Sequence, residues 1–236
     1  MRTICIAGFA ELSRRWANDQ PPEVEIWGMN EVHLFIKRWT LWFQIHPKDF
    51  RVATKVSLGM DTRLPPDGYG RPQQHVDWLA KCGVPVLMQE PDPRVPTSVR
   101  YPYEDVFRVI GRKYLSSTPA YMLAYALTQP DIEEIRIAGV ELAIGTEHVH
   151  QRPNFEWLMG LAQGMGKRVV LPPWGCALLN GPLYGIDPTP VLAKDVVNQP
   201  RLVVATARGI ARVKMAEEPA EERKLAPSLP LSKAVP

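Results

Sequence analysis

Six short apolar segments that do not alternate between apolar and polar residues are the feature that most restricts the fold of this chain. Segments with the composition and spacing of helices separate them. Strands without alternation are buried on both faces, and when they alternate with helices they form a parallel sheet covered on both sides. The pattern predicts an α/β protein, a Rossmann-like three-layer sandwich with a mainly parallel sheet. The predicted strands are residues 3–7, 24–28, 41–45, 85–88, 134–138 and 168–171.

The remaining segments complete this organisation. The predicted helices are residues 12–18, 31–37, 73–81, 103–111, 119–128 and 154–163. Two proline-containing segments, residues 64–72 and 90–102, are predicted to be loops. We expect a Rossmann-like domain over residues 1–180 and a C-terminal extension over residues 181–236. Within this extension, residues 201–215 are predicted to form an amphipathic helix, and the charged, proline-rich residues 216–236 are predicted to be disordered or to order on a partner.

The composition excludes several classes of protein. The formal net charge of +3 is too small to favour nucleic acid or a membrane surface, and no basic run stands out. We expect no secretory leader, and no apolar stretch is long enough to cross a bilayer. Cys5, Cys82 and Cys176 lack the spacing of metal ligands, so we expect reduced thiols in a cytoplasmic setting.

Three hydroxyl residues, Ser116, Ser117 and Thr118, precede Pro119 at the start of a predicted helix. Thr118 is the predicted N-cap and Pro119 the first helical residue. The free N–H groups of a first helical turn, its dipole and these hydroxyls suit a phosphate or a carboxylate. Residues 120–127 have almost no polar face, so we expect this helix to be buried against the sheet. An ordinary capped core helix is the alternative interpretation.

Polar or permissive residues follow the first three predicted strands, where ligands of parallel α/β sheets bind. Gly8 allows close backbone approach, Asn30 offers a donor and an acceptor to a base or ribose, and His46 can pair with phosphate or carry a proton. A tight turn, a helix N-cap and a structural histidine are the respective alternatives. The chain has neither a three-glycine dinucleotide fingerprint nor a Walker loop, so no nicotinamide or flavin cofactor is expected.

Glu141 comes shortly after the fifth predicted strand, and a reactive-looking loop follows it. It carries His148, His150 and Arg152, and these groups can supply a general base and an anion clamp. A polar surface loop is the alternative. The His-x-His pair also suggests a metal, but no third ligand of convincing spacing is visible, so we predict no metal. The absence of any Asp-x-Asp pair argues against a donor held through a metal-bridged diphosphate.

These features together resemble the bacterial CMP-sialic-acid-dependent sialyltransferases and the related motility-accessory-factor proteins. The similarity is clearest over residues 116–179: the hydroxyl-rich helix start, the Tyr121-Met122 pair within the helix, the strand that leads to Glu141, and a later strand that ends near Pro173. The Gln-Arg-Pro sequence at Gln151 also resembles uncharacterised phage-encoded proteins.

The resemblance implies particular site residues. It places a nucleotide-activated sugar over the first three strand ends and the helix start. Either His148 or His150 corresponds to the family's general base, and Glu141 stands where the family has an aspartate. The family's polar first turn is replaced here by Phe9-Ala10-Glu11, which favours a different sugar, a different nucleotide or a loss of catalysis. The implied donor contacts are Gly8, Asn30, His46, Ser116, Ser117 and Thr118.

The sequence thus predicts a metal-independent glycosyltransferase-like protein that binds a nucleotide-sugar donor and transfers the sugar to an unidentified acceptor hydroxyl. Its predicted setting is the cytoplasm of a bacterium or a phage-infected host. A non-catalytic binding or assembly protein, phage-associated and acting as a homo-oligomer or through its tail or a tryptophan-rich surface, is the alternative. A pyrophosphoryl transferase is the third hypothesis, but it needs magnesium-binding carboxylates, of which only Glu141 is well placed.

Overall fold

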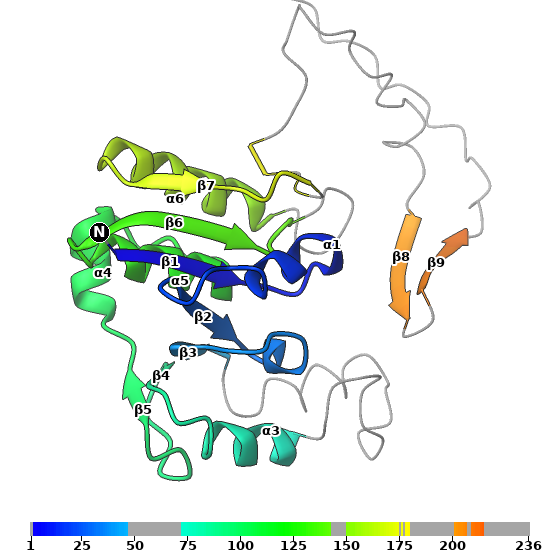
Figure 1. Cartoon of the computed structure of the whole chain (residues 1–236), viewed down its shortest axis with the longest axis horizontal. Helices are drawn as coiled ribbons and strands as arrows, with labels where there is room; N and C mark the ends of the chain where they lie inside the picture. The colour runs from blue at the N-terminus through cyan, green and yellow to red at the C-terminus, as the bar shows by residue number, and fades with distance from the viewer. Residues whose placement is uncertain are drawn as a thin grey trace, which may run out of the picture.

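One seven-stranded sheet forms the centre of the protein (Figure 1). The computed structural model describes residues 2–46, 72–142, 150–174, 176 and 178–179, with the backbone alone at residues 72–74 and in two strands at 201–206 and 209–214. The sheet has the order β5-β4-β3-β2-β1-β6-β7, and all of its neighbouring strands are parallel. Its strands are β1 (Arg2–Ala7), β2 (Glu25–Met29), β3 (Leu41–Gln44), β4 (Val86–Met88), β5 (Ser98–Arg100), β6 (Ile132–Ala138) and β7 (Arg168–Val170).

The strand order reverses beside β1. From β1 the chain builds the sheet outwards through β2 to β5, and then it crosses back to place β6 on the other side of β1. The two strands run in register to their ends, where Ala7 is paired with Ala138. The loop after β1 leads to one face of the sheet and the loop after β6 leads to the other. In sheets of this kind the ligand crevice lies beyond the carboxyl ends of two such strands.

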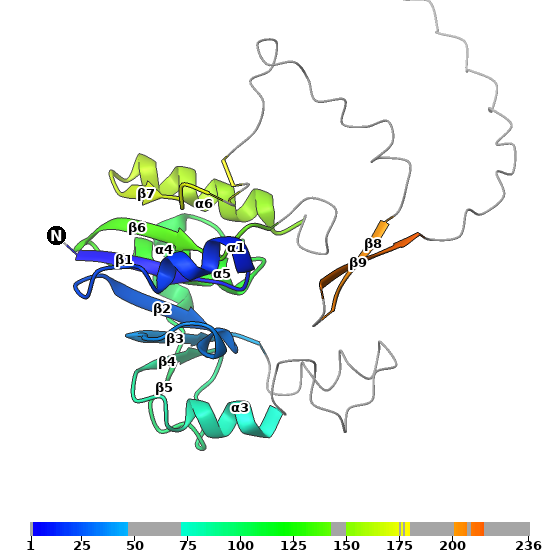
Figure 2. The same cartoon turned by 45° about the vertical axis from the view of Figure 1, so that its right-hand side comes forward.

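Helices cover both faces of the sheet, which confirms the predicted three-layer sandwich (Figures 1 and 2). One face carries α4 (Tyr103–Ile110), α5 (Thr118–Leu127) and α6 (Arg152–Gly164). The other carries α1 (Glu11–Arg14), the 3₁₀ turns η1 (Arg15–Ala17) and η2 (Val32–Leu34), and α3 (Pro72–Leu79). Helix α5 packs on β1, β2, β3 and β6, and most of its side chains are buried, as its lack of a polar face predicts.

Each face of the sheet has its own hydrophobic core. Ile4 and Trp27 point toward α5, whereas their neighbours Cys5 and Ile26 point toward the α1 side. Successive residues of a strand face opposite sides, so covering both sides requires consecutive apolar residues. This burial explains why the strands show no alternation.

Two predictions on the sheet and its connections were incomplete. Residues 98–100, expected to be part of a loop, form the edge strand β5 against β4. Val99 and Arg100 are exposed there, so this strand lacks the apolar run by which buried strands are identified. The helix expected over residues 31–37 is only the single 3₁₀ turn η2.

The predicted helix over residues 201–215 is wrong. These residues form an antiparallel hairpin of β8 (Arg201–Thr206) and β9 (Gly209–Lys214), with Thr206 paired with Gly209. Its valines and isoleucine are β-branched, which favours a strand over a helix. The loop predicted over residues 64–72 overlaps α3, which begins at Pro72. Its residues 64–71 and the tail over residues 216–236 lie outside the described residues.

We predict that Gly28→Ala destabilises the protein, because a Cβ atom at Gly28 would lie 2.1 Å from the ring of the buried Trp42. Overpacking of this kind costs about 1–3 kcal/mol of the free energy of unfolding. Gly160→Ala is the matched control: a Cβ there meets open space, and alanine in a helix gains about 1 kcal/mol over glycine. Urea unfolding measures both changes, and a Gly28→Ala protein as stable as the parent contradicts this packing.

Candidate functional site

The loops after β1 and β6 are in direct backbone contact at the carboxyl edge of the sheet. The Gly8 N–H donates to the Ala138 carbonyl at 2.7 Å, and the Ala10 N–H donates to the Gly139 carbonyl at 2.8 Å. A Cβ atom at Gly8 would lie only 2.3 Å from the Gly139 oxygen. The close approach predicted at Gly8 is therefore made to the β6 loop, and a further contact of Gly8 with a ligand stays a prediction.

Ser13 of α1 anchors Glu141 beside this contact. Ser13 is fully buried, and its Oγ accepts a hydrogen bond from the Gly139 N–H at 3.1 Å and donates one to Glu141 Oε1 at 3.0 Å. No other hydrogen bond to Glu141 is formed among the described residues, so Oε2 can accept a hydroxyl proton from a ligand. Sequence reasoning missed Ser13, because nothing local marks a contact between residues 128 positions apart.

The N-cap of α5 is Ser117 and not Thr118, so the predicted helix start was wrong by one residue. Ser117 has an extended backbone, and its Oγ accepts a hydrogen bond from the Ala120 N–H at 3.4 Å. Thr118 is instead the first helical residue, and it is buried. The side-chain oxygen of an N-cap satisfies an N–H that the first turn leaves without a helical partner, and Ser117 serves that function here.

Asn154 joins the amino ends of α5 and α6. Its side chain is fully buried; Oδ1 accepts hydrogen bonds from both the N–H and the Oγ of Ser116 at 3.0 Å, and Nδ2 donates to the Tyr114 carbonyl at 2.9 Å. Each of these helices leads directly into a strand of the parallel sheet, β6 or β7, so both amino ends lie at its carboxyl edge. Two helix dipoles therefore present their positive ends on this side of the molecule.

Asn30 and His46 lie at the neighbouring ends of β2 and β3. Asn30 has the left-handed φ of 48°, and its N–H donates to the Phe43 carbonyl at 3.1 Å. Its Oδ1 is buried and has no hydrogen-bond partner among the described residues. The alternative interpretation of Asn30 as a helix N-cap is wrong, because Glu31 holds that position before η2. His46 is half-buried, and burial lowers the pKa of its imidazole.

Arg152 begins α6 on the Glu141 side of the edge. Its Nε donates to Glu156 Oε1 at 2.9 Å, so part of its donor capacity is used within the helix. Burial raises the pKa of the Cys176 thiol; Glu141 adds to this rise and Arg152 opposes it. His150 is exposed just before α6, whereas His148 lies outside the described residues.

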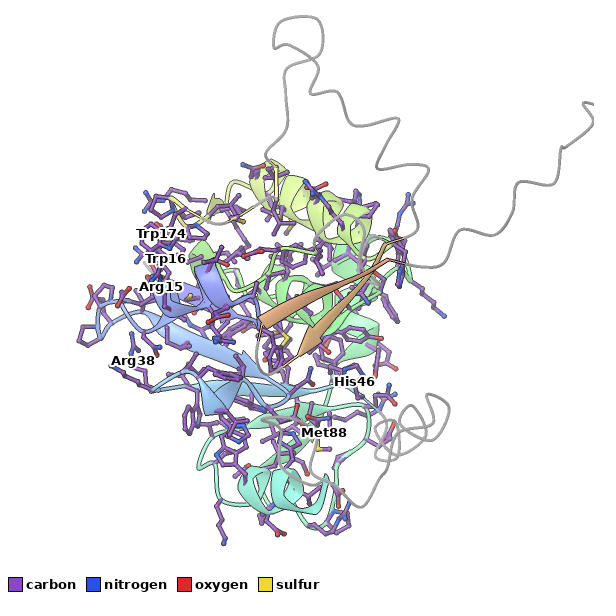
Figure 3. All side chains as sticks on the ribbon, turned by 90° about the vertical axis from the view of Figure 1, so that its right-hand side faces the viewer. Arg15, Trp16, Arg38, His46, Met88 and Trp174 are labelled. Carbon is purple, nitrogen blue, oxygen red and sulfur yellow. The ribbon has the colours of Figure 1, made fainter. Side chains whose placement is uncertain are left out.

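Most of the predicted site residues thus share one edge, which Figure 3 views face on with His46 labelled. Gly8 and Glu141 belong to the point where the strand order reverses, Ser116 to Thr118 and Arg152 to the two helix starts, and Asn30 and His46 to the next two strand ends. Among the described residues, no three His, Cys, Asp or Glu side chains form a group that could hold a metal ion. No helix in that same part of the chain is long and apolar enough to span a membrane.

A cluster of indole and imidazole rings lies under β3 on the α1 side. The His33 and Trp78 rings stack with centroids 3.8 Å apart, and Trp42 packs against Trp78 at 4.6 Å. Trp42 is fully buried and Trp39 packs on it edge-on. Trp42 therefore belongs to the core, Trp39 and Trp78 are half-buried against it, and Trp174 is 42% exposed.

No family model and no curated protein matches this chain. Solved structures similar to it include the sialyltransferase CstII from Campylobacter jejuni in complex with the substrate analogue CMP-3FNeuAc, at 11% identity and a TM-score of 0.43, over 72% of this chain and 81% of that one. CstII in complex with cytidine-5'-monophosphate matches at 9% identity and a TM-score of 0.46, over 72% and 79% of the two chains. These neighbours are sialyltransferases, the family that the sequence resembles. Likeness this distant carries no information on the ligand or activity of this chain.

We predict that Ser117→Ala lowers the free energy of unfolding by about 1 kcal/mol, because it removes the N-cap of α5. Thr118→Val is the matched variant, since it removes only a hydroxyl and keeps the buried volume. Chemical denaturation of both proteins decides which residue caps the helix. If Thr118→Val has the larger cost, the cap belongs to Thr118.

We also predict that the protein loses stability as the pH falls below about 6.5, the pKa of an unperturbed histidine. Burial lowers the pKa of His46 and of His33 in the folded state, so the unfolded chain binds more protons in this range. Unfolding free energies measured between pH 7.5 and pH 5 should decrease, and His46→Gln should make the decrease shallower. His150→Gln is the control, because this side chain is exposed; an equal effect of both substitutions contradicts the prediction.

Proposed function

We propose that the protein is a metal-independent glycosyltransferase that binds a nucleotide-activated sugar at the carboxyl edge of its sheet. The observation that carries the proposal is the position of Glu141. The buried Ser13 holds its carboxylate at the point where the strand order reverses, on the same edge as the amino ends of α5 and α6. A carboxylate able to accept a proton lies there on the same edge as two dipole ends that favour a phosphate. Proton removal and leaving-group stabilisation are the two needs of sugar transfer.

The donor's phosphate would lie at the start of α5, near Ser117 and Thr118, with Arg152 of α6 on its other side. The nucleoside would extend over Gly8 toward Asn30 and His46. The buried Asn30 Oδ1, which has no partner among the described residues, supports this direction, because a base or ribose can supply the missing donor. Ser116 would contribute by orienting the helix start, since Asn154 accepts hydrogen bonds from both its N–H and its hydroxyl.

In the proposed reaction the acceptor hydroxyl gives its proton to a general base while its oxygen forms a bond to the anomeric carbon. The bond from that carbon to the donor phosphate breaks, and the nucleotide leaves with the electron pair. Glu141, His148 and His150 are the candidate bases, and the Ser13 hydrogen bond supports Glu141 by fixing its orientation. The helix ends would stabilise the departing phosphate without a metal ion.

The proposal includes a cytoplasmic setting in a bacterium or a phage-infected cell. All three cysteines are free, and Cys5 is fully buried, which suits a reducing compartment. The acceptor in this proposal is a compound that carries a free hydroxyl group. Of the tryptophans that the alternative of an assembly protein with a tryptophan-rich surface involves, Trp42 is fully buried, Trp39 is half-buried and Trp174 is 42% exposed.

We predict that the full chain binds a CMP-, UDP- or GDP-sugar and that Glu141→Gln lowers turnover about 10²- to 10⁴-fold, the usual contribution of a general base. Donor affinity should remain close to that of the parent, because this substitution keeps the size of the side chain. Calorimetric titration measures binding, and nucleotide release measures turnover, with and without EDTA. His148→Gln and His150→Gln are matched variants, and the largest loss identifies the base. An absence of binding at donor concentrations well above millimolar refutes the proposed function, and a loss of turnover in EDTA refutes its metal independence.

A further inference from the structure

A cavity of about 300 Å³ lies beside α1, outside the residues assigned so far. We call it the α1 pocket. Helix α1 directly follows the loop that contains Gly8, and its Ser13 bonds Glu141, so the pocket adjoins the carboxyl edge of the sheet. Figure 3 shows Arg15 on this side of the molecule. The pocket is lined by Glu11, Leu12, Arg14, Arg15, Asn18 and Phe35.

The walls of the α1 pocket are fixed by contacts between distant segments. Asn18 Nδ2 donates to the Phe35 carbonyl at 3.1 Å, and Asn18 Oδ1 accepts from the Lys37 N–H at 2.8 Å. The Arg14 guanidinium lies 3.8 Å from the centroid of the Phe35 ring and donates to the Phe9 carbonyl at 2.8 Å. A site held in this way loses little conformational entropy when a ligand binds.

Two apolar side chains of the pocket remain accessible. Phe35 is 37% exposed and Leu12 is 60% exposed. Covering them with the apolar face of a ligand is favourable, and the flat phenyl ring suits a ligand that is itself a flat or chair-shaped ring. Small-molecule sites commonly combine such apolar walls with a few polar groups.

The polar groups of the pocket specify the charge of the ligand. Arg14 and Arg15 oppose Glu11, which leaves one formal positive charge. Arg15 and Glu11 are exposed, and the side chain of neither forms a hydrogen bond or ion pair with another described residue. Arg15 can therefore bind an anion, while Glu11 can accept hydrogen bonds from hydroxyl groups and repels a second negative charge.

We propose that the α1 pocket binds a saccharide with a single carboxylate, a uronic acid in chemical class. Its ring packs on Phe35 and Leu12, its carboxylate pairs with Arg15, and a hydroxyl donates to Glu11. Helix α1 lines the pocket and also carries Ser13, which bonds Glu141, so we assign this saccharide as the acceptor of the proposed glycosyl transfer. That assignment alone rests on the proposed function.

Ligand-observed NMR titration of the full chain with glucuronate, and with glucose as the neutral match, tests the pocket. Glucuronate should bind more tightly than glucose by about threefold, the effect of one exposed ion pair, and Arg15→Gln should abolish the difference. Phe35→Leu, which keeps an apolar side chain but removes the flat ring, should weaken both sugars about threefold, in line with the loss of an aromatic contact. Arg108→Gln is the charge-matched control, because this exposed arginine lies on α4, across the sheet.

No binding of glucuronate, equal binding of both sugars, or an unchanged preference in Arg15→Gln overturns the proposal. An equal loss in Arg108→Gln assigns the preference to net charge and also overturns it. The titration contains no nucleotide, so its outcome is separate from that of the proposed function. If the protein binds glucuronate but no nucleotide sugar, the proposal for the α1 pocket stands and the proposed transferase function is refuted.

Discussion

The contact between Gly8 and Gly139 is the constraint on which the rest of the carboxyl edge depends. A side chain on either glycine would overlap the backbone of the other loop, since a Cβ at Gly139 would lie 2.4 Å from the Gly8 oxygen. Gly139 also has a φ of 69°, a conformation that glycine adopts without strain. Only this close approach brings the Gly139 N–H within reach of Ser13, and Ser13 in turn positions Glu141. One backbone contact thus places the carboxylate of the candidate site.

Helix α5 supplies the second constraint, because an apolar helix of this kind is stable only when other elements bury it on all sides. It packs on four strands, on α4 and on α6. Its amino end is then held by the Ser117 cap and by the bonds from Ser116 to Asn154. The same burial that stabilises the fold therefore fixes where the positive end of the helix dipole lies.

The fold could be predicted from the sequence wherever an element is buried on all sides and therefore consists of consecutive apolar residues. The strand that starts at Thr3 and the helix that starts near Pro119 are apolar on every side, and both were predicted within a residue or two of their bounds. Strand β5 is exposed at the sheet edge, so Val99 and its neighbours carry no such pattern. The amphipathic spacing of residues 201–214 suggests a helix, but their β-branched residues favour strands and form the hairpin of β8 and β9.

The candidate site was predictable only to the level of strand ends. The rule that ligands bind beyond the carboxyl ends of parallel strands identifies Gly8, Asn30 and Glu141 without knowledge of contacts. Ser13 and Asn154 could not be found in this way, because their hydrogen bonds join residues far apart in the chain and follow no local motif. The sequence lacks the information on which polar groups already have hydrogen-bond partners within the protein.

That information changes how an anion can be held at this edge. The donors of Ser116 bond Asn154, the Ala120 N–H bonds the Ser117 cap, and Pro119 has no N–H. Ser117 and Thr118 therefore keep the two N–H groups among residues 116–120 for which the described residues provide no partner. Arg152 already pairs with Glu156. A phosphate here would therefore interact mainly with helix dipoles and less with formal charge, whereas Arg15 offers a full charge on the α1 side.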